Sequence, residues 1–94
     1  MSSSADYLEY VLDLLSSLDD ITYKRMMGEF LLYYKGVLFG GIYDNRFLVK
    51  KKPILEKYHL EEEIPYPSAK PMYLISTEDR MLIKEIVESL AQTL

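Results

Sequence analysis

The chain has 94 residues, of which 49% are hydrophobic, and it carries a net charge of -4. This length predicts one domain, residues 1–94, and the apolar fraction excludes a wholly disordered chain. Because there is no cysteine and a single histidine, His59, the chain builds neither a disulfide framework nor a multi-histidine metal site.

No targeting or membrane segment is visible in the sequence. The start, MSSSADYLEY, lacks the basic and apolar regions of a signal peptide. No apolar run approaches the roughly 20 residues that cross a bilayer. We therefore expect a cytoplasmic protein without a membrane contact.

Charge is distributed unevenly along the chain. Residues 1–21 contain five acids and no base, residues 22–58 contain eight bases and three acids, and residues 59–94 contain three bases and seven acids. A basic segment within an acidic protein can mark an interaction surface. It can also follow simply from packing helices and strands of opposite charge together.

The first segment has the periodicity of a helix. Its apolar residues recur at spacings of three and four, and they are Leu8, Val11, Leu12, Leu15 and Leu18. Ser3 and Asp6 have the spacing of a capping box, and Asp19-Asp20 marks the exit from the helix.

From Thr22 onward, β-branched, aromatic and aliphatic residues replace the helical pattern. This composition predicts strands at 22–27, 30–34, 37–43 and 46–50. Gly28 marks the first bend, and Lys35-Gly36 and Asp44-Asn45 have the chemistry of two-residue hairpin turns. Gly40-Gly41 inside a strand indicates a bulge or the close approach of another backbone, most simply that of a packed helix.

Regular pairing across these turns makes both faces of the sheet apolar. One face would carry Leu31, Tyr33, Leu38, Gly40, Ile42, Phe47 and Val49. The other would carry Phe30, Leu32, Tyr34, Val37, Phe39, Gly41, Tyr43, Arg46, Leu48 and Lys50. A sheet with one solvated face alternates apolar and polar residues instead. We therefore expect helices on one face and a second copy of the chain on part of the other.

The last third completes the predicted fold. Pro53 opens a short helix that could shield part of the second face, and 61–71 is an exposed connection. A fifth strand is predicted at 72–76, and Ser76 or Thr77 caps a final helix. The apolar stripe of this helix is Leu82, Ile83, Ile86, Val87, Leu90 and Leu94. The result is a two-layer α+β fold, roughly α-β-β-β-β-α-β-α, whose antiparallel sheet is flanked by N- and C-terminal helices.

The middle of the chain carries a recognisable pattern. Residues 25–33 read RMMGEFLLY, residues 39–42 read FGGI, and residues 44–50 read DNRFLVK, with Lys35-Gly36 between the first two. Together with PMYL at 71–74, these segments resemble the N-terminal domain of the TfoX/Sxy competence-regulator family, over nearly the whole chain. The resemblance implies a two-layer fold similar to small dimeric secretion-chaperone-like domains. It implies regulation through partner contacts, and no enzyme activity.

Four residues depart from the pattern of that family. Met27 stands where the family usually has phenylalanine, Glu29 and Leu31 where it has glycines, and Lys35 where it often has aspartate. These changes weaken any transfer of loop geometry around Gly28 and leave the hydrophobic frame intact. The regulators of the family also have a second, helical domain, for which 94 residues leave no room. We therefore expect a stand-alone domain of the N-terminal type.

We predict a non-enzymatic regulatory module that binds a protein partner and forms homodimers. The candidate partner-binding residues are Arg25, Met26, Phe30, Tyr34, Arg46 and Lys50. No catalytic, cofactor-binding or metal-binding residue is expected. His59 beside the acids at 61–63 fits a solvated helix end better than a site, because a site needs convergent partners.

Two alternative functions remain open. Lys24, Arg25 and the lysines at 50–52 could line a nucleic-acid surface on which tyrosines stack bases. The acidic balance of the whole chain argues against direct nucleic-acid binding and favours lysines that protect a strand edge. A small ligand-binding domain or enzyme is the second alternative, and it requires a concave pocket with convergent polar groups.

Overall fold

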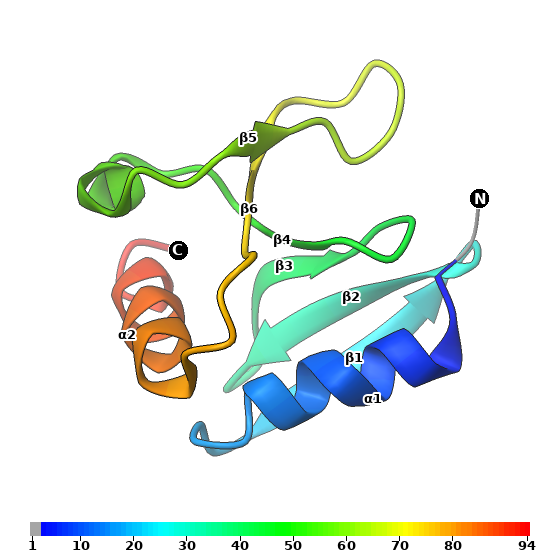
Figure 1. Ribbon diagram of the computed structural model, residues 1–94, viewed down its shortest axis with the longest axis horizontal. Coiled ribbons are helices and arrows are strands. Elements are labelled where there is room, and N and C mark those ends of the chain that lie inside the picture. The colour runs from blue at the N-terminus through cyan, green and yellow to red at the C-terminus, as the bar shows by residue number, and fades with distance from the viewer. Residues whose placement is uncertain (1–2) are drawn as a thin grey trace.

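An antiparallel sheet of six strands organises the fold (Figure 1). The computed structural model of the protein describes residues 3–94. In chain order the strands are β1 (Ile21–Met26), β2 (Glu29–Tyr34), β3 (Val37–Ile42), β4 (Phe47–Val49), β5 (Glu62–Glu63) and β6 (Met72–Leu74). Across the sheet their order is β1-β2-β3-β4-β6-β5. The predicted α+β class and element order are confirmed, with one addition, because β5 lies in the segment predicted as a connection.

Three helical segments pack around one hydrophobic core. They are α1 (Ala5–Leu14), the 3-10 helix η1 (Pro53–Tyr58) and α2 (Arg80–Ala91). Figure 1 shows α1 lying along β1 and β2, with α2 and η1 at the far end of the molecule. The fully buried core side chains include Val11, Leu15, Phe30, Leu32, Phe39, Ile42, Phe47, Val49, Leu55, Ile83, Ile86, Val87 and Leu90. The predicted apolar stripes of both long helices therefore supply much of this core.

Helix ends differ from the predicted ones. The N-cap of α1 is Ser4, whose hydroxyl accepts the N–H of Tyr7 at 3.1 Å. The predicted cap at Ser3 is wrong, because the hydroxyl of Ser3 donates to the carboxylate of Glu29 at 2.6 Å. The side chain of Asp79 caps α2 by accepting two backbone N–H groups, in place of the predicted Ser76 or Thr77.

The C-terminal helix is also shorter than predicted. Because α2 ends at Ala91, Leu94 lies beyond the apolar stripe and is 40% exposed. The short helix η1 packs against α2 and places Leu55 in the shared core. The prediction that this helix shields the opposite face of the sheet is therefore wrong.

A bulge in β3 changes the predicted register. Tyr33 pairs with Leu38, but the next residue of β2, Leu32, pairs with Gly40, so Phe39 is the extra residue. Beyond this point every predicted cross-strand pair between β2 and β3 is displaced by one. The two apolar faces predicted from regular turns are wrong for that reason. Phe30 and Leu32 share a face with Ile42, not with Gly41.

The glycine pair allows close approach of neighbouring strands. A Cβ on Gly40 would lie 2.3 Å from the carbonyl oxygen of Leu48 in β4. A Cβ on Gly41 would lie 2.6 Å from the carbonyl oxygen of Phe30 in β2. The predicted bulge and close backbone approach are thus confirmed, whereas the packed helix that we expected as their cause is replaced by strands.

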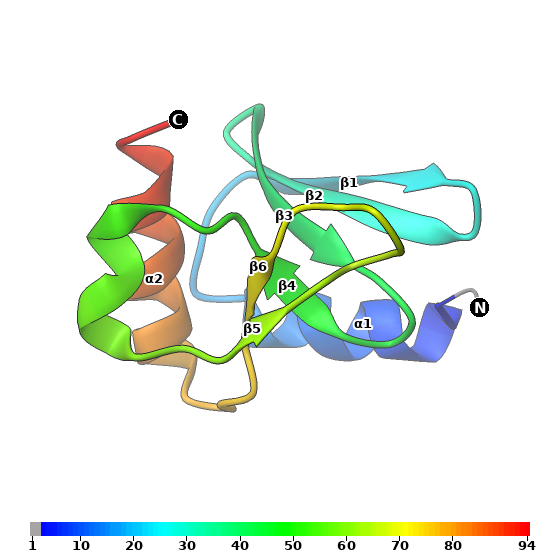
Figure 2. The same ribbon diagram turned by 90° about the horizontal axis from the view of Figure 1, so that it is seen from above.

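The sheet has two different faces. The covered face packs on the helices, and along β2 it carries Phe30 and Leu32, which are 1% and 0% exposed. The open face carries the alternate residues Leu31 and Tyr33, which are only partly buried. Figures 1 and 2 show the connection between β5 and β6 rising over β4 on the side away from α1. The segment 64–71 therefore lies over one part of the open face and leaves the β1–β3 part without a helix.

Candidate functional site

The tip of the first hairpin presents methionine to solvent. Met27 and Gly28 form the turn between β1 and β2, with φ values of 51° and 85°. Both are left-handed conformations, which suit a tight hairpin but are uncommon for a residue such as methionine. Met27 is 96% exposed and the neighbouring Met26 is 52% exposed. The turn thus holds two flexible apolar side chains away from the core.

These methionines form one wall of a hollow on the open face, with a volume of about 540 Å³. Its lining residues are Met26, Met27, Glu29, Leu31, Tyr43 and Tyr66. The tyrosine rings stand 6.2 Å apart between centroids and are tilted by 51°, and Tyr66 is 59% exposed. We call this feature the apolar hollow. Its lining combines adaptable methionines with aromatic rings, a mixture that suits protein contacts.

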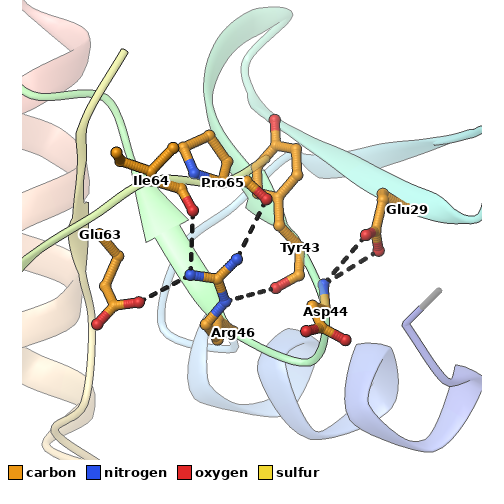
Figure 3. A network of polar contacts seen from close by, with 7 residues as sticks. All are labelled: Glu29, Tyr43, Asp44, Arg46, Glu63, Ile64 and Pro65. Atoms are coloured by element: carbon orange, nitrogen blue, oxygen red, sulfur yellow. Dashed lines mark hydrogen bonds and ion pairs between the residues drawn. The ribbon is translucent and has the colours of Figure 1, made fainter. Parts of the chain in front are cut away.

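Arg46 holds the far wall of the apolar hollow in place (Figure 3). Its guanidinium donates through Nη1 to the carboxylate of Glu63 at 2.8 Å and to the carbonyl of Ile64 at 3.2 Å. Nη2 donates to the carbonyl of Pro65 at 3.1 Å, and Nε to the carbonyl of Tyr43 at 3.1 Å. A rigid guanidinium fork can make such a multiple contact, which a lysine cannot. Arg46 therefore fastens the β5–β6 connection to the β3–β4 turn and helps to position Tyr66 beside Tyr43.

Glu29 fastens the near rim of the apolar hollow. Its carboxylate accepts the backbone N–H of Asp44 at 3.1 and 3.2 Å and the hydroxyl of Ser3 at 2.6 Å. The Ser3 hydroxyl in turn accepts the N–H of Asn45 at 3.0 Å. Figure 3 shows Glu29 reaching the β3–β4 turn. The hairpin tip, the β3–β4 turn and the start of α1 are thus linked through one carboxylate.

The phenol of Tyr43 stays protonated at neutral pH. Burial raises the pKa of Tyr43, and the neighbouring Tyr66 and Glu29 raise this pKa further. The side chain therefore presents a neutral hydroxyl and an aromatic ring to the hollow.

A second hollow, of about 470 Å³, adjoins the first and is basic. It is lined by Lys50, Lys51, Lys52 and Lys70 together with Tyr43, Pro65, Tyr66, Ala69, Pro71 and Met72. Lys51 pairs with Glu62 at 3.1 Å across an exposed surface. We call it the lysine hollow. Because Tyr43 and Tyr66 line both hollows, the apolar and basic surfaces are continuous.

Two of the sequence-predicted residues line this surface, and a third lies next to it. Met26 lines the apolar hollow and Lys50 lines the lysine hollow, whereas Arg46 lines neither and its guanidinium is bonded within the chain. The remaining three, Arg25, Phe30 and Tyr34, lie on the covered side of β1 and β2, away from both hollows.

Phe30 is 1% exposed in the core, so its side chain does not reach the surface. The guanidinium of Arg25 lies 5.1 Å from the ring centroid of Phe30 at the exposed edge of that face. Tyr34 packs partly against the core, with the ammonium of Lys35 5.3 Å from its ring centroid. The six residues therefore do not form one site.

Sequence reasoning missed five lining residues of the apolar hollow, which are Met27, Glu29, Leu31, Tyr43 and Tyr66. Tyr66 lies between two prolines in the connection 64–71, where an aromatic residue has no core to fill. An exposed aromatic residue in such a segment could have been recognised from the sequence as a candidate contact residue. The contribution of Leu31 depends on the bulge register, which the sequence does not reveal.

The described residues, 3–94, contain no cluster of three or more histidine, cysteine or acidic side chains that could hold a metal ion. Within the same part of the chain, every helix is too short or too polar to cross a lipid bilayer.

A comparison with curated protein sequences found no significant match. The sequence profile of the TfoX N-terminal domain matches residues 13–89, which include every strand, η1 and most of α2, but only the last two residues of α1. This match covers most of the chain and agrees with the resemblance of its central motif. It supports a domain of the competence-regulator type. The chain belongs to the TfoX N-terminal domain family.

Proposed function

We propose that this domain is a non-enzymatic regulatory module that binds one protein partner across the apolar and lysine hollows. The observation that carries the proposal is the continuity of the two hollows through Tyr43 and Tyr66. An apolar surface rimmed by charge is typical of an interaction site. Its layout suits an apolar side chain followed by acidic residues, because the four lysines of the second hollow complement negative charge.

The partner preference of this surface would be particular to this chain. Met27, Glu29 and Leu31 line the apolar hollow, and they are three of the positions at which the sequence departs from the family pattern. A phenylalanine and two glycines there would give a different wall. We therefore propose that the hairpin tip determines which partner binds, while the hydrophobic frame supplies the common fold.

Peptide titration followed by amide NMR tests this function. The probes are a panel of short peptides in which leucine or phenylalanine precedes three glutamates, and matched peptides with lysine in place of glutamate. We expect the acidic panel to shift the resonances of Met26, Leu31 and Tyr66 together with those of Lys50 and Lys52. The lysine panel should bind about tenfold more weakly or worse, because it meets like charge.

A pair of methionine variants provides the control. Met27→Glu places a charge in the apolar hollow and should weaken binding of the acidic peptides about tenfold or more. Met81→Glu changes another exposed methionine, 66% exposed on α2 and remote from the hollow, and should leave binding unchanged. Equal binding by both variants, or shifts confined to other faces, would refute the proposed site.

Nucleic acid is a second candidate ligand for the lysine hollow, since four lysines surround two tyrosine rings there. Single-stranded DNA titrated across a salt series separates the two functions. Binding that weakens steeply with salt and shifts the lysine resonances without those of the methionines would replace the protein partner by nucleic acid.

A further inference from the structure

The long free edge of the sheet is β1. It pairs with β2 on one side and ends the strand order on the other. Five of its six residues are exposed. The opposite edge is β5, which has two residues. Within residues 3–94 no strand pairs with this edge, which therefore offers unpaired backbone groups to another strand. Proteins commonly block or use such an edge.

Alternate residues of β1 direct their backbone groups outward. The N–H of Lys35 donates to the carbonyl of Asp20 at 3.0 Å, and the register continues from there without a shift along β1. Antiparallel pairs alternate between bonded and non-bonded. The backbone groups of Thr22 and Lys24 therefore face β2, whereas those of Ile21, Tyr23 and Arg25 face the free edge.

The segment around β1 is complementary to itself. It reads DDITYKR from Asp19 to Arg25, with acids at one end and bases at the other. Two copies aligned antiparallel about Thr22 bring Asp19 and Asp20, in the bend that precedes β1, close to Lys24 and Arg25 of the other copy. The same alignment sets Ile21 against Tyr23, a β-branched and aromatic pair of a kind that stabilises sheets.

This register also allows the backbone N–H and C=O groups at the free edge to form hydrogen bonds between the two copies. It joins Ile21 of one copy to Tyr23 of the other, and both residues direct their N–H and C=O groups to the edge. Moving the centre to Lys24 would oppose two lysines, and a parallel alignment would oppose acid to acid. Among residues 3–94, the ion pairs formed within the chain involve none of Asp19, Asp20, Lys24 and Arg25. Their charges are thus available to another molecule.

We propose that the free edge of β1 binds the same edge of a second copy, in antiparallel register centred on Thr22. The dimer has two-fold symmetry and one continuous sheet. Because the axis of such a pair is perpendicular to the sheet, both open faces lie on the same side, and each dimer presents two apolar hollows. This proposal is independent of the partner function, since β1 lies outside the lysine hollow and contributes only Met26 to the apolar one.

Charge reversal tests the proposal through the mass in solution. The acidic variant combines Lys24→Glu with Arg25→Glu, and the basic variant combines Asp19→Lys with Asp20→Lys. We expect the wild type to sediment as a dimer and each variant alone as a monomer, because like charges now meet across the two-fold axis. Mixing the two variants should restore a dimer that contains one copy of each.

The mixture also controls for folding, because an unfolded variant could not form the mixed dimer. A matched control combines Lys57→Glu with Lys84→Glu, which changes the net charge equally but away from β1 and from both hollows, and it should remain a dimer. A wild type that stays monomeric from micromolar to millimolar concentration would overturn the proposal. So would a dimer that survives both reversals, or a mixture that stays monomeric.

Discussion

The two faces of the sheet differ in how deeply their apolar side chains are buried. On the covered face, Phe30 and Leu32 are locked between strands and helices and are almost completely buried. On the open face, Leu31 lies beside the exposed methionine side chains of the hairpin tip and near a connection that Arg46 holds by hydrogen bonds. Close packing makes the first face a source of stability. The second face buries less apolar area on folding, and Leu31 stays partly exposed there. Under the proposed function, stability and binding can therefore change separately, residue by residue along β2.

Substitutions of two neighbouring leucines in β2 should show the largest difference in the free energy of unfolding. Leu32→Ala removes a fully buried side chain and should lower the free energy of unfolding by about 2–5 kcal/mol. Leu31→Ala, one residue earlier on the open face, should lower it by about 1 kcal/mol or less. Urea unfolding followed by circular dichroism measures both. Similar losses for the two variants would mean that the faces are not distinct.

Removal of the arginine clamp should have an intermediate effect. Arg46→Met keeps the apolar stem but loses the donors to Glu63, Ile64, Pro65 and Tyr43. We expect stability to fall by about 1–3 kcal/mol. The amides of 64–71 should also exchange hydrogen much faster, whereas those of α1 should not. Unchanged exchange in the connection would show that other contacts hold it.

The smallest expected effect is a dependence of stability on alkaline pH. The pKa of Tyr43 is raised in the folded state, so folding holds its proton more tightly than the unfolded chain does. Its contribution is full below the ordinary tyrosine pKa of about 10 and disappears as the pH rises through the folded value. Unfolding midpoints should fall above that pH, and Tyr43→Phe should reduce the fall. The other tyrosines with raised pKa values, Tyr7, Tyr10 and Tyr58, leave a residual dependence.

Local chemistry made much of the fold predictable. The apolar stripes marked both long helices, and Lys35-Gly36 and Asp44-Asn45 marked two hairpins whose turn residues all have positive φ. These signals depend on near neighbours, and the structure confirms them.

The parts that the sequence did not reveal depend on tertiary contacts. The bulge at Phe39 inserts one residue without a change in composition, so the assignment of faces beyond it failed. Ser3 and Ser4 are chemically equivalent as caps, and the choice between them follows from the position of Glu29, 26 residues away. The apolar hollow required the connection 64–71 to return over β4, a position set by the pairing of β5 with β6 and by the clamp at Arg46.

The strand order has a consequence for the sequence of folding events. From β1 to β4 each strand pairs with its predecessor, so tight turns can form this meander early and with little loss of loop entropy. By contrast, β6 lies between β4 and β5, so its pairing with β4 must span η1 and β5, and α2 follows β6 in the chain. The apolar hollow needs Tyr66 from the connection that precedes β6. We therefore expect binding competence to appear only after the β1–β4 meander has formed and the segment that carries Tyr66 has joined it.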